Sequence, residues 1–300
     1  MNKLEQVKAI KNGKGIQYLL NTAKMIFHNP LSTADMYYRL IALTDYIVDD
    51  SMWNELIATG SISMTGQEAL AKKDFLEKIA NADKSVIVRN DQMKHGRMVG
   101  YFFNRENIKA GLLAMYEYDT PFDDESRAAF ELLASKITRE IRNDEYFTTF
   151  GRAFHEDMIK RLLDGVIKDP SVYTPHVQVL YDGFEDYLHV AVVDVSRNDI
   201  QQNNLEYVKN SLMSKNQSYK YAIYSDYIVV IMSSKQRCSC YVPFFDQDNS
   251  LFEQNDIFVG IGNSFESLYE LRVYYDQAVA AIKSGVESKS GQRVFTYNND

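Results

Sequence analysis

The stretch Phe258-Val-Gly-Ile-Gly-Asn263 decides how the second half of this chain is interpreted. It reads as a short apolar strand that ends in glycines. An amphipathic helix follows, with its pattern in Ser267-Leu-Tyr-Glu-Leu271 and Gln277-Ala-Val-Ala-Ala-Ile282. Gly260 and Gly262 allow either a close backbone approach or a turn with positive φ, both of which a Cβ atom would obstruct. The stretch therefore predicts a β-strand followed by a helix.

The length and composition of the chain favour two soluble domains. A chain of 300 residues is too long for one average domain. Its 45% hydrophobic and 25% charged residues are typical of globular proteins. No run approaches the roughly 18 apolar residues that span a bilayer, and residues 1–5 lack the apolar core of a secretory signal. We expect a cytoplasmic protein with no membrane partner.

The charge and the cysteines exclude further classes of function. A net charge of −8 and a pI near 5.3 argue against nucleic-acid binding by this segment, because binding phosphates requires clustered Lys and Arg. Cys238 and Cys240 lie on one face of an expected strand, which is poor geometry for a disulfide. We expect them to be small buried apolar residues. The five histidines show no metal-ligand spacing. No metal or cofactor is expected.

Residues 1–145 have the pattern of one α+β domain. Helices are predicted at residues 15–27, 49–56, 70–82 and 123–143, and strands at 36–43, 85–88, 97–104 and 108–118. A polar turn through Ser32, Thr33 and Asp35 is expected before the first strand. Asp49-Asp-Ser51 offers an N-cap for the short helix that follows it.

A helical linker is predicted at residues 146–170, and a second domain at 171–300. The linker has an apolar stripe that comprises Phe154, Met158, Leu162 and Leu163. The second domain has strand patterns at 187–195, 219–224 and 227–233 and a helix at 204–213, before the stretch that begins at Phe258. We expect a four- or five-stranded sheet with helices on its faces.

Several short motifs, in this order, resemble the CdaR/PucR group of bacterial transcriptional regulators. In the first half these are Asn29-Pro30 with Asp35, Asp50 shortly before Trp53, Met98-Val-Gly-Tyr101, and Thr120-Pro-Phe-Asp-Asp124. In the second half Ile159-Lys-Arg-Leu-Leu-Asp-Gly165 resembles the linker of those regulators, and the Phe258 strand with its helix resembles the end of their degenerate GGDEF-like domain. The resemblance implies an α+β protein with an antiparallel-sheet GAF/PAS-like sensor and a GGDEF-like α/β sandwich.

An enzymatic alternative follows from the same resemblance, because active GGDEF domains condense two GTP molecules. They need a metal-binding carboxylate at the end of the first strand and a Gly-Gly-Asp-Glu-Phe hairpin. Asp194 matches the first requirement. The hairpin position reads Tyr224-Ser-Asp-Tyr-Ile228, so both glycines are absent and Tyr227 replaces the glutamate. We expect no enzyme activity, and we expect Asp194 and Asp226 to be turn formers at strand ends.

Ligand sensing has better support, since the first domain combines arginine and tyrosine on predicted strand faces. By period-2 alternation the candidate ligand-binding residues are Tyr37, Arg39, Arg97, Tyr101, Phe103 and Tyr116. Such faces suit a small anion such as a carboxylate, and a purine is the second ligand class considered. The alternative is that the aromatic side chains fill the core and the arginines lie in water at strand ends.

These observations predict the sensory and oligomerising region of a cytoplasmic transcriptional regulator. A small-molecule effector would act on a homodimer held through the helix at 123–143 and its continuation through 150–167. In this family the output is a C-terminal helix-turn-helix, and only a short tail follows Ser284. We therefore expect DNA contact only through a domain that this chain lacks. The rival interpretation is a ligand-free dimerisation scaffold, and a nucleotide cyclase-like enzyme is the remote one.

Overall fold

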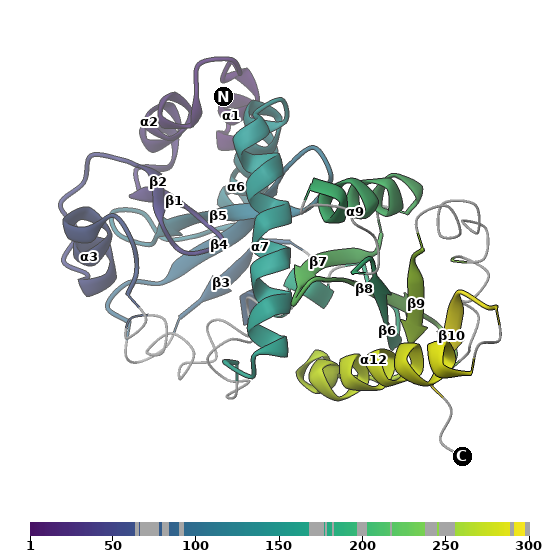
Figure 1. The fold of residues 1–300 in the computed structure, drawn as a ribbon. Coiled ribbons are helices and arrows are strands. Elements are labelled where there is room, and N and C mark those ends of the chain that lie inside the picture. Colours follow the sequence, from purple (N-terminus) through teal and green to yellow (C-terminus); the bar gives the residue numbers. More distant parts are fainter. Residues whose placement is uncertain are drawn as a thin grey trace. The chain divides into compact units, whose positions relative to one another are not determined.

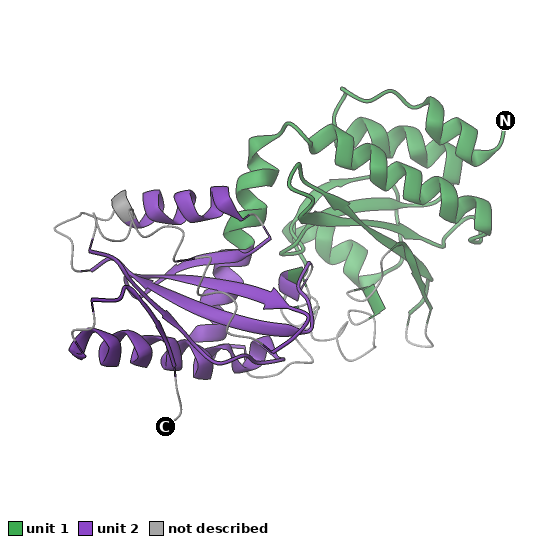
Figure 2. Cartoon of the chain, turned by 90° about the vertical axis from the view of Figure 1, so that its right-hand side faces the viewer, with its two compact units in different colours: residues 1–154, 171–179 green, residues 155–170, 180–300 purple. Residues whose placement is uncertain are grey.

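The computed structural model describes residues 1–63, 66, 78–79, 84–89, 93–167, 177, 179–181, 183–196, 203–216, 218–237, 245, 256–288 and 291–297. The chain is a mixed α+β protein, as predicted, and divides into two compact units (Figure 2). Unit 1 comprises residues 1–154 and 171–179, and unit 2 comprises residues 155–170 and 180–300. Among the described helices, none is long and apolar enough to cross a membrane.

Unit 1 is built on a five-stranded antiparallel sheet with the strand order β2-β1-β5-β4-β3 (Figure 1). The strands are β1 (Leu31–Asp35), β2 (Leu40–Leu43), β3 (Val86–Val88), β4 (Arg97–Phe103) and β5 (Lys109–Tyr116). The helices are α1 (Lys3–Ala9), α2 (Ile16–Phe27), α3 (Ser51–Thr59), α6 (Asp124–Ile141) and the first part of α7 (Glu145–Leu163).

The two faces of this sheet are covered by different helices, because side chains alternate along each strand. Met98, Phe102 and Leu113 face a core formed with α1, α2 and α6. Val99 and Leu112 belong to a second apolar cluster that includes Leu56 of α3. The period-2 alternation predicted for β4 and β5 is confirmed.

The predicted polar turn at Ser32–Asp35 is wrong, and so is the start of the strand predicted at 36–43. Residues 31–35 form the fully buried strand β1, which is paired on both sides. Its polar residues are tolerated because the backbone is satisfied in the sheet and the Thr33 hydroxyl donates to the Ala42 carbonyl at 3.2 Å. The turn follows it, where Tyr38 has φ 57° and the Asp35 carboxylate accepts from the backbone of Tyr37.

Unit 2 contains a second five-stranded sheet with the order β10-β9-β6-β8-β7, in which only the β10–β9 pair is parallel among the described strands. The strands are β6 (Tyr187–Asp194), β7 (Lys220–Tyr224), β8 (Tyr227–Ser234), β9 (Phe258–Ile261) and β10 (Val294–Thr296). The helices are the end of α7, α9 (Asn203–Lys215), a 3-10 turn η1 (Leu268–Glu270) and α12 (Leu271–Glu287). In Figure 1, α9 and α12 lie on opposite faces of this sheet.

Some predictions fall wholly or mainly outside the described residues or are left open. The helix predicted at 70–82 lies outside them except for residues 78 and 79, and Cys238 and Cys240 lie outside them as well. The linker predicted at 146–170 overlaps α7, a helix that begins in unit 1 and ends in unit 2. The predicted domain boundaries remain predictions.

Gly260 and Gly262 bring β9 and α12 into close contact. A Cβ on Gly260 would lie 2.0 Å from the carbonyl oxygen of Ala278, and one on Gly262 would lie 2.5 Å from that of Tyr274. Neither glycine has positive φ among the described residues. The close approach, and not a special turn, is therefore the reason for glycine at both positions.

Replacing Gly260 with alanine is expected to destabilise unit 2. The added methyl group would collide with the α12 backbone, which cannot rotate away as a side chain could, at a cost of about 1–3 kcal/mol. Urea unfolding followed by far-UV circular dichroism measures this loss. Gly96→Ala is the control, because the atoms that its Cβ would meet are side-chain atoms of Glu117 and Arg89. Equal stabilities of the two variants would contradict the packing argument.

Candidate functional site

A buried ion pair lies on the α3 face of the unit 1 sheet. Arg97, the first residue of β4, donates from Nη2 to Oδ2 of Asp50 at 2.7 Å. The two side chains are only 5% and 6% exposed. Asp50 is also the N-cap of α3, because its Oδ1 accepts from the backbone N–H groups of Met52 and Trp53 at 3.0 and 3.1 Å. One carboxylate therefore ties α3 to the sheet and begins the helix.

Aromatic and sulfur-containing side chains surround the guanidinium of Arg97. It lies over the ring of Tyr116, its cross-strand neighbour on β5, at 5.0 Å from the centroid. Trp53 meets Tyr116 edge to face at 5.1 Å, and Met52 Sδ lies 3.3 Å from Arg97 Nη1. Burial raises the pKa of Tyr116 and the positive charge of Arg97 partly offsets this, so the phenol is neutral at neutral pH.

A second ion pair lies beside the buried one but is open to water. Asp49 precedes Asp50 and pairs with Lys94, whose side chain is 58% exposed. The hydrogen bond from Lys94 lowers the pKa of Asp49. Exposed pairs contribute little to stability, so the buried pair dominates the attachment of α3 here.

The structure separates the six candidate residues predicted from the sequence into three places. Arg97 and Tyr116 lie together, as described above. Tyr101 is farther along β4 in the apolar cluster with Val99, and Lys109 Nζ lies 4.1 Å from its ring centroid. Phe103 is the partly buried last residue of β4.

Tyr37 and Arg39 do not join this group, because they belong to the turn that follows β1. Arg39 Nε donates to Asp35 at 2.6 Å, and its guanidinium lies 5.2 Å from the ring centroid of Phe150 on α7. The Tyr37 ring meets Phe150 and Phe154 edge to face. Arg39 is 53% exposed. These residues attach the first half of α7 to the turn within unit 1.

Asp50 and Trp53 belong to the site but are not among the ligand-binding residues predicted from the sequence. A signal for them existed, since Asp50 carries the N-cap pattern and stands in one of the motifs quoted above. The pattern predicts a cap and gives no indication of the arginine 47 positions later with which it pairs.

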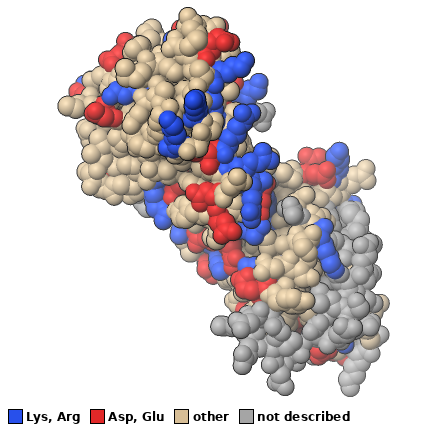
Figure 3. Space-filling model, turned by 90° about the horizontal axis from the view of Figure 1, so that it is seen from above, with Lys and Arg blue, Asp and Glu red and all other residues tan. Residues whose placement is uncertain are grey.

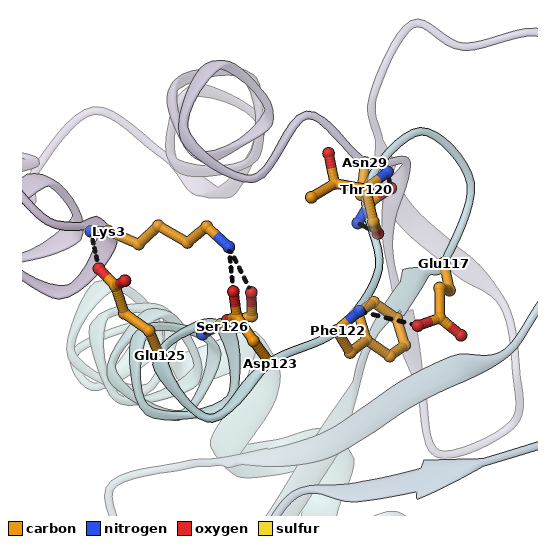
Figure 4. Close-up of polar contacts among 8 residues, drawn as sticks. All are labelled: Lys3, Asn29, Glu117, Thr120, Phe122, Asp123, Glu125 and Ser126. Atoms are coloured by element: carbon orange, nitrogen blue, oxygen red, sulfur yellow. Dashed lines mark hydrogen bonds and ion pairs between the residues drawn. The ribbon is translucent and has the colours of Figure 1, made fainter.

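The end of β5 connects the site to helix α6 through a tightly bonded loop (Figure 4). Asn29 is buried, and its Oδ1 accepts from the backbone N–H groups of residues 118, 119 and 120 at 3.0, 3.0 and 3.1 Å. Its Nδ2 donates to the carbonyl of Thr120. Glu117 accepts from the N–H of Phe122 at 2.8 Å. Asn29 therefore explains the Asn29-Pro30 motif: it fixes the loop that begins next to Tyr116.

The same loop ends at the N-terminus of α6. Asp123 is the N-cap and accepts from the N–H of Ser126 at 2.6 Å. Lys3 Nζ contacts Asp123 Oδ2 at 3.1 Å and Ser126 Oγ at 2.7 Å, as Figure 4 shows. The hydrogen bonds of Asp123 lower its pKa to about 2, so it stays ionised. The loop between Tyr116 and α6 is therefore held by hydrogen bonds at both of its ends.

The hairpin between β7 and β8 in unit 2 contacts the ends of two helices. Ser225 and Asp226 have φ values of 47° and 66° and form its two-residue turn. Tyr227 pairs with Asp194 across the sheet, and Asp194 accepts from the N–H of Ser196. The prediction that Asp194 and Asp226 are turn formers is confirmed.

Tyr224, at the other side of this hairpin, contacts two helix ends. Its hydroxyl donates to Asp164, directly after α7, at 2.7 Å, and its ring meets Tyr275 of α12 edge to face. Arg272 Nη1 donates to the carbonyl of Leu163, the last residue of α7. The hairpin thus anchors the end of α7 within unit 2.

The groups at this site are suited to recognising an anion. Arg97 is a fork-shaped cation that matches the geometry of carboxylates and phosphates, and aromatic rings lie beside it. In the described part of the chain, no three His, Cys, Asp or Glu side chains are grouped so that they could hold a metal ion.

Comparisons with known proteins add little to this geometry. No family model matches the chain, and no curated protein matches it. Among solved structures, the crystal structure of PelD 158-CT from Pseudomonas aeruginosa PAO1 matches with 9% sequence identity and a TM-score of 0.28. The match covers 97% of this chain and 96% of that one. A likeness at this TM-score supports no conclusion about the fold or the function.

Replacing Asn29 with alanine is expected to destabilise unit 1 by about 1–3 kcal/mol, because three backbone donors lose their common acceptor. Thermal unfolding followed by the fluorescence of Trp53, the single tryptophan, measures the loss. The control is Asn21→Ala, since Asn21 is exposed and its side-chain oxygen accepts from the side chain of Gln17. A change of under about 0.5 kcal/mol for Asn29→Ala, as for a surface site, would contradict the role given to this residue.

Proposed function

We propose that this chain is the sensory and oligomerising region of a cytoplasmic transcriptional regulator of the CdaR/PucR type. Unit 1 is the GAF/PAS-like sensor and binds a small-molecule effector at Arg97. Unit 2 is a degenerate GGDEF-like domain without catalysis. When the effector binds, the arrangement of helices in a homodimer changes, and unit 2 transmits this change to a helix-turn-helix domain of the regulator.

The observation that carries the proposal is the buried guanidinium of Arg97 on a sheet face lined with aromatic side chains. Burying a charge is costly, and a core needs none at this position. Its partner comes from a different element, the N-cap of α3, and the ring of Tyr116 stands directly before the loop that leads to α6. A change at Arg97 would therefore act next to the segment that leads to a long helix.

The absence of catalysis is supported by what the substituted residues do instead. Tyr227 supplies no carboxylate opposite Asp194. The Tyr224 hydroxyl donates a hydrogen bond to Asp164. In this proposal the hairpin stabilises the end of α7 and positions no nucleotide. This supports a scaffold that retains the GGDEF-like topology and has lost its chemistry.

The surface supports assigning DNA contact to another domain. On the face that Figure 3 shows, acidic side chains lie among the basic ones. On α7, Lys160 pairs with Glu156 and Arg161 pairs with Asp157 at 2.9 and 2.8 Å. Each of these two cations has an acidic neighbour on the same helix, so the two pairs together present no net positive charge to a phosphate backbone.

The rival function, a dimerisation scaffold without ligand, also has a specific observation in its favour. The charge of Arg97 is already matched by Asp50, and the neighbouring rings pack against each other. A completed ion pair of this kind could simply hold α3 in place. Ligand binding at Arg97 separates the two functions.

A thermal-shift screen with carboxylates, purines and sugar acids, read by Trp53 fluorescence, tests the proposal. A ligand at one hundred times its Kd adds about 2.7 kcal/mol to the stability of the folded state. For a unit of this size that is a rise in Tm of roughly 5–10 °C. Arg97→Met is expected to abolish the rise.

Two results would count against the proposal. A flat screen across all classes favours the scaffold. A cyclic dinucleotide formed on incubation with GTP and Mg²⁺ would show that unit 2 is an enzyme and that Tyr224 and Tyr227 do not block catalysis.

A further inference from the structure

We propose that the effector carries a carboxylate or phosphate group that binds Arg97 in exchange for Asp50, and that this exchange releases the first turn of α3. The inference rests on the proposed function, in which unit 1 is the sensor. It adds the chemical class of the ligand and the structural step by which binding is registered.

The two oxygens of Asp50 have different tasks, and only one of them stands where a ligand would bind. Oδ2 accepts from Arg97, whereas Oδ1 accepts from the N–H groups of Met52 and Trp53. The Asp50 carboxylate thus occupies the position at Arg97 that the anionic group of the effector would take. An anion that takes over Arg97 competes with the residue that caps α3.

The energetics of the exchange select an anionic ligand. Removing one partner of a buried ion pair is strongly destabilising, because the other charge stays buried without compensation. A neutral ligand that displaced Asp50 would incur this cost in full. A carboxylate or phosphate replaces one negative group with another, so Arg97 remains neutralised throughout.

The release of Asp50 would change the environment of Trp53, whose backbone N–H donates to Asp50 Oδ1. The Trp53 indole donates from Nε1 to the carbonyl of Tyr46 at 3.2 Å and its ring contacts Tyr116. Trp53 is 1% exposed. The start of α3 holds this side chain in place, so exchange at Arg97 would alter both the helix start and the contact with β5.

The charged groups beside the site do not hold α3 in place of the Arg97–Asp50 pair, so they do not prevent the exchange. Lys94 and Asp49 pair in water beside the site, and the His95 ring lies 4.9 Å from the ring of Tyr118. The exposed pair contributes too little to hold α3 alone. Arg97 is the buried cation of this cluster among the residues described, and it is the group to be tested.

Chemical rescue tests the exchange directly in the 300-residue chain. Asp50→Gly removes the carboxylate but leaves a residue that is well tolerated at an N-cap. Sodium acetate is the probe, with sodium chloride at equal ionic strength as its reference. We expect acetate to raise the Tm of Asp50→Gly in a saturable way, by roughly 3–6 °C at about ten times its Kd. Inorganic phosphate, run in parallel, shows which anion class Arg97 prefers.

Matched variants identify the place where acetate acts. The wild-type chain and Asp123→Gly, which removes the exposed aspartate N-cap of α6, are expected to gain no more in acetate than in chloride. The double variant Asp50→Gly/Arg97→Met is expected to lose the rescue. Asp50→Ser, which keeps a capping hydroxyl in a shorter side chain, serves the same purpose if Asp50→Gly does not fold.

Equal effects of acetate and chloride on the Asp50 variants would overturn the inference, as would a rescue that persists without Arg97. Its failure is distinguishable from failure of the proposed function. An effector found in the wild-type screen together with absent rescue leaves sensing intact and removes the exchange. Rescue that requires Arg97 supports the anion site whatever the natural effector is.

Discussion

A guanidinium group that is removed from water requires a carboxylate beside it, and in unit 1 this requirement joins two distant parts of the chain. Arg97 begins β4, and Asp50 precedes α3. Their pair places α3 over the outer face of the sheet and brings Trp53 against Tyr116. On the opposite face, α1, α2 and α6 form an apolar core with the sheet, and the buried Lys136 of α6 donates to the carbonyl of Ile10 without a carboxylate partner in this contact.

Unit 2 depends on a different constraint, the close approach of two backbones. Gly260 and Gly262 allow α12 to lie directly on β9. The hairpin at Tyr224 then uses its aromatic side chain to contact α12 and the end of α7. Both features are packing contacts that fix helices against the sheet of unit 2.

Much of the fold could be predicted from local sequence patterns. Alternation along β4 and β5 correctly placed Arg97 and Tyr116 on one face, and the acidic residue Asp123 correctly marked the start of α6. The glycines at the β9 end were identified, and the structure decided between the two reasons offered for them. These features are local, because each depends on residues within one turn or one pair of strand positions.

The rest required contacts that local patterns do not show. Tyr37 and Arg39 were assigned to a strand, but the turn at Tyr38 precedes β2, and a small shift in register moves side chains to another face. Polar Ser32 and Thr33 indicated a turn, although pairing on both sides makes them part of a buried strand. The partner of Arg97 was missed because 47 residues separate it from Asp50. Only the folded sheet brings the two together.

A double-mutant cycle on Asp50 and Arg97 tests the central claim most directly. Asp50→Asn and Arg97→Met, alone and combined, would be unfolded in urea under Trp53 fluorescence. The account predicts a loss of about 3–5 kcal/mol for each single variant, and a double variant hardly less stable than either one, which gives a coupling energy of about 3 kcal/mol. Losses that simply add, with a coupling energy below about 0.5 kcal/mol, would show that the pair does not hold α3 to the sheet.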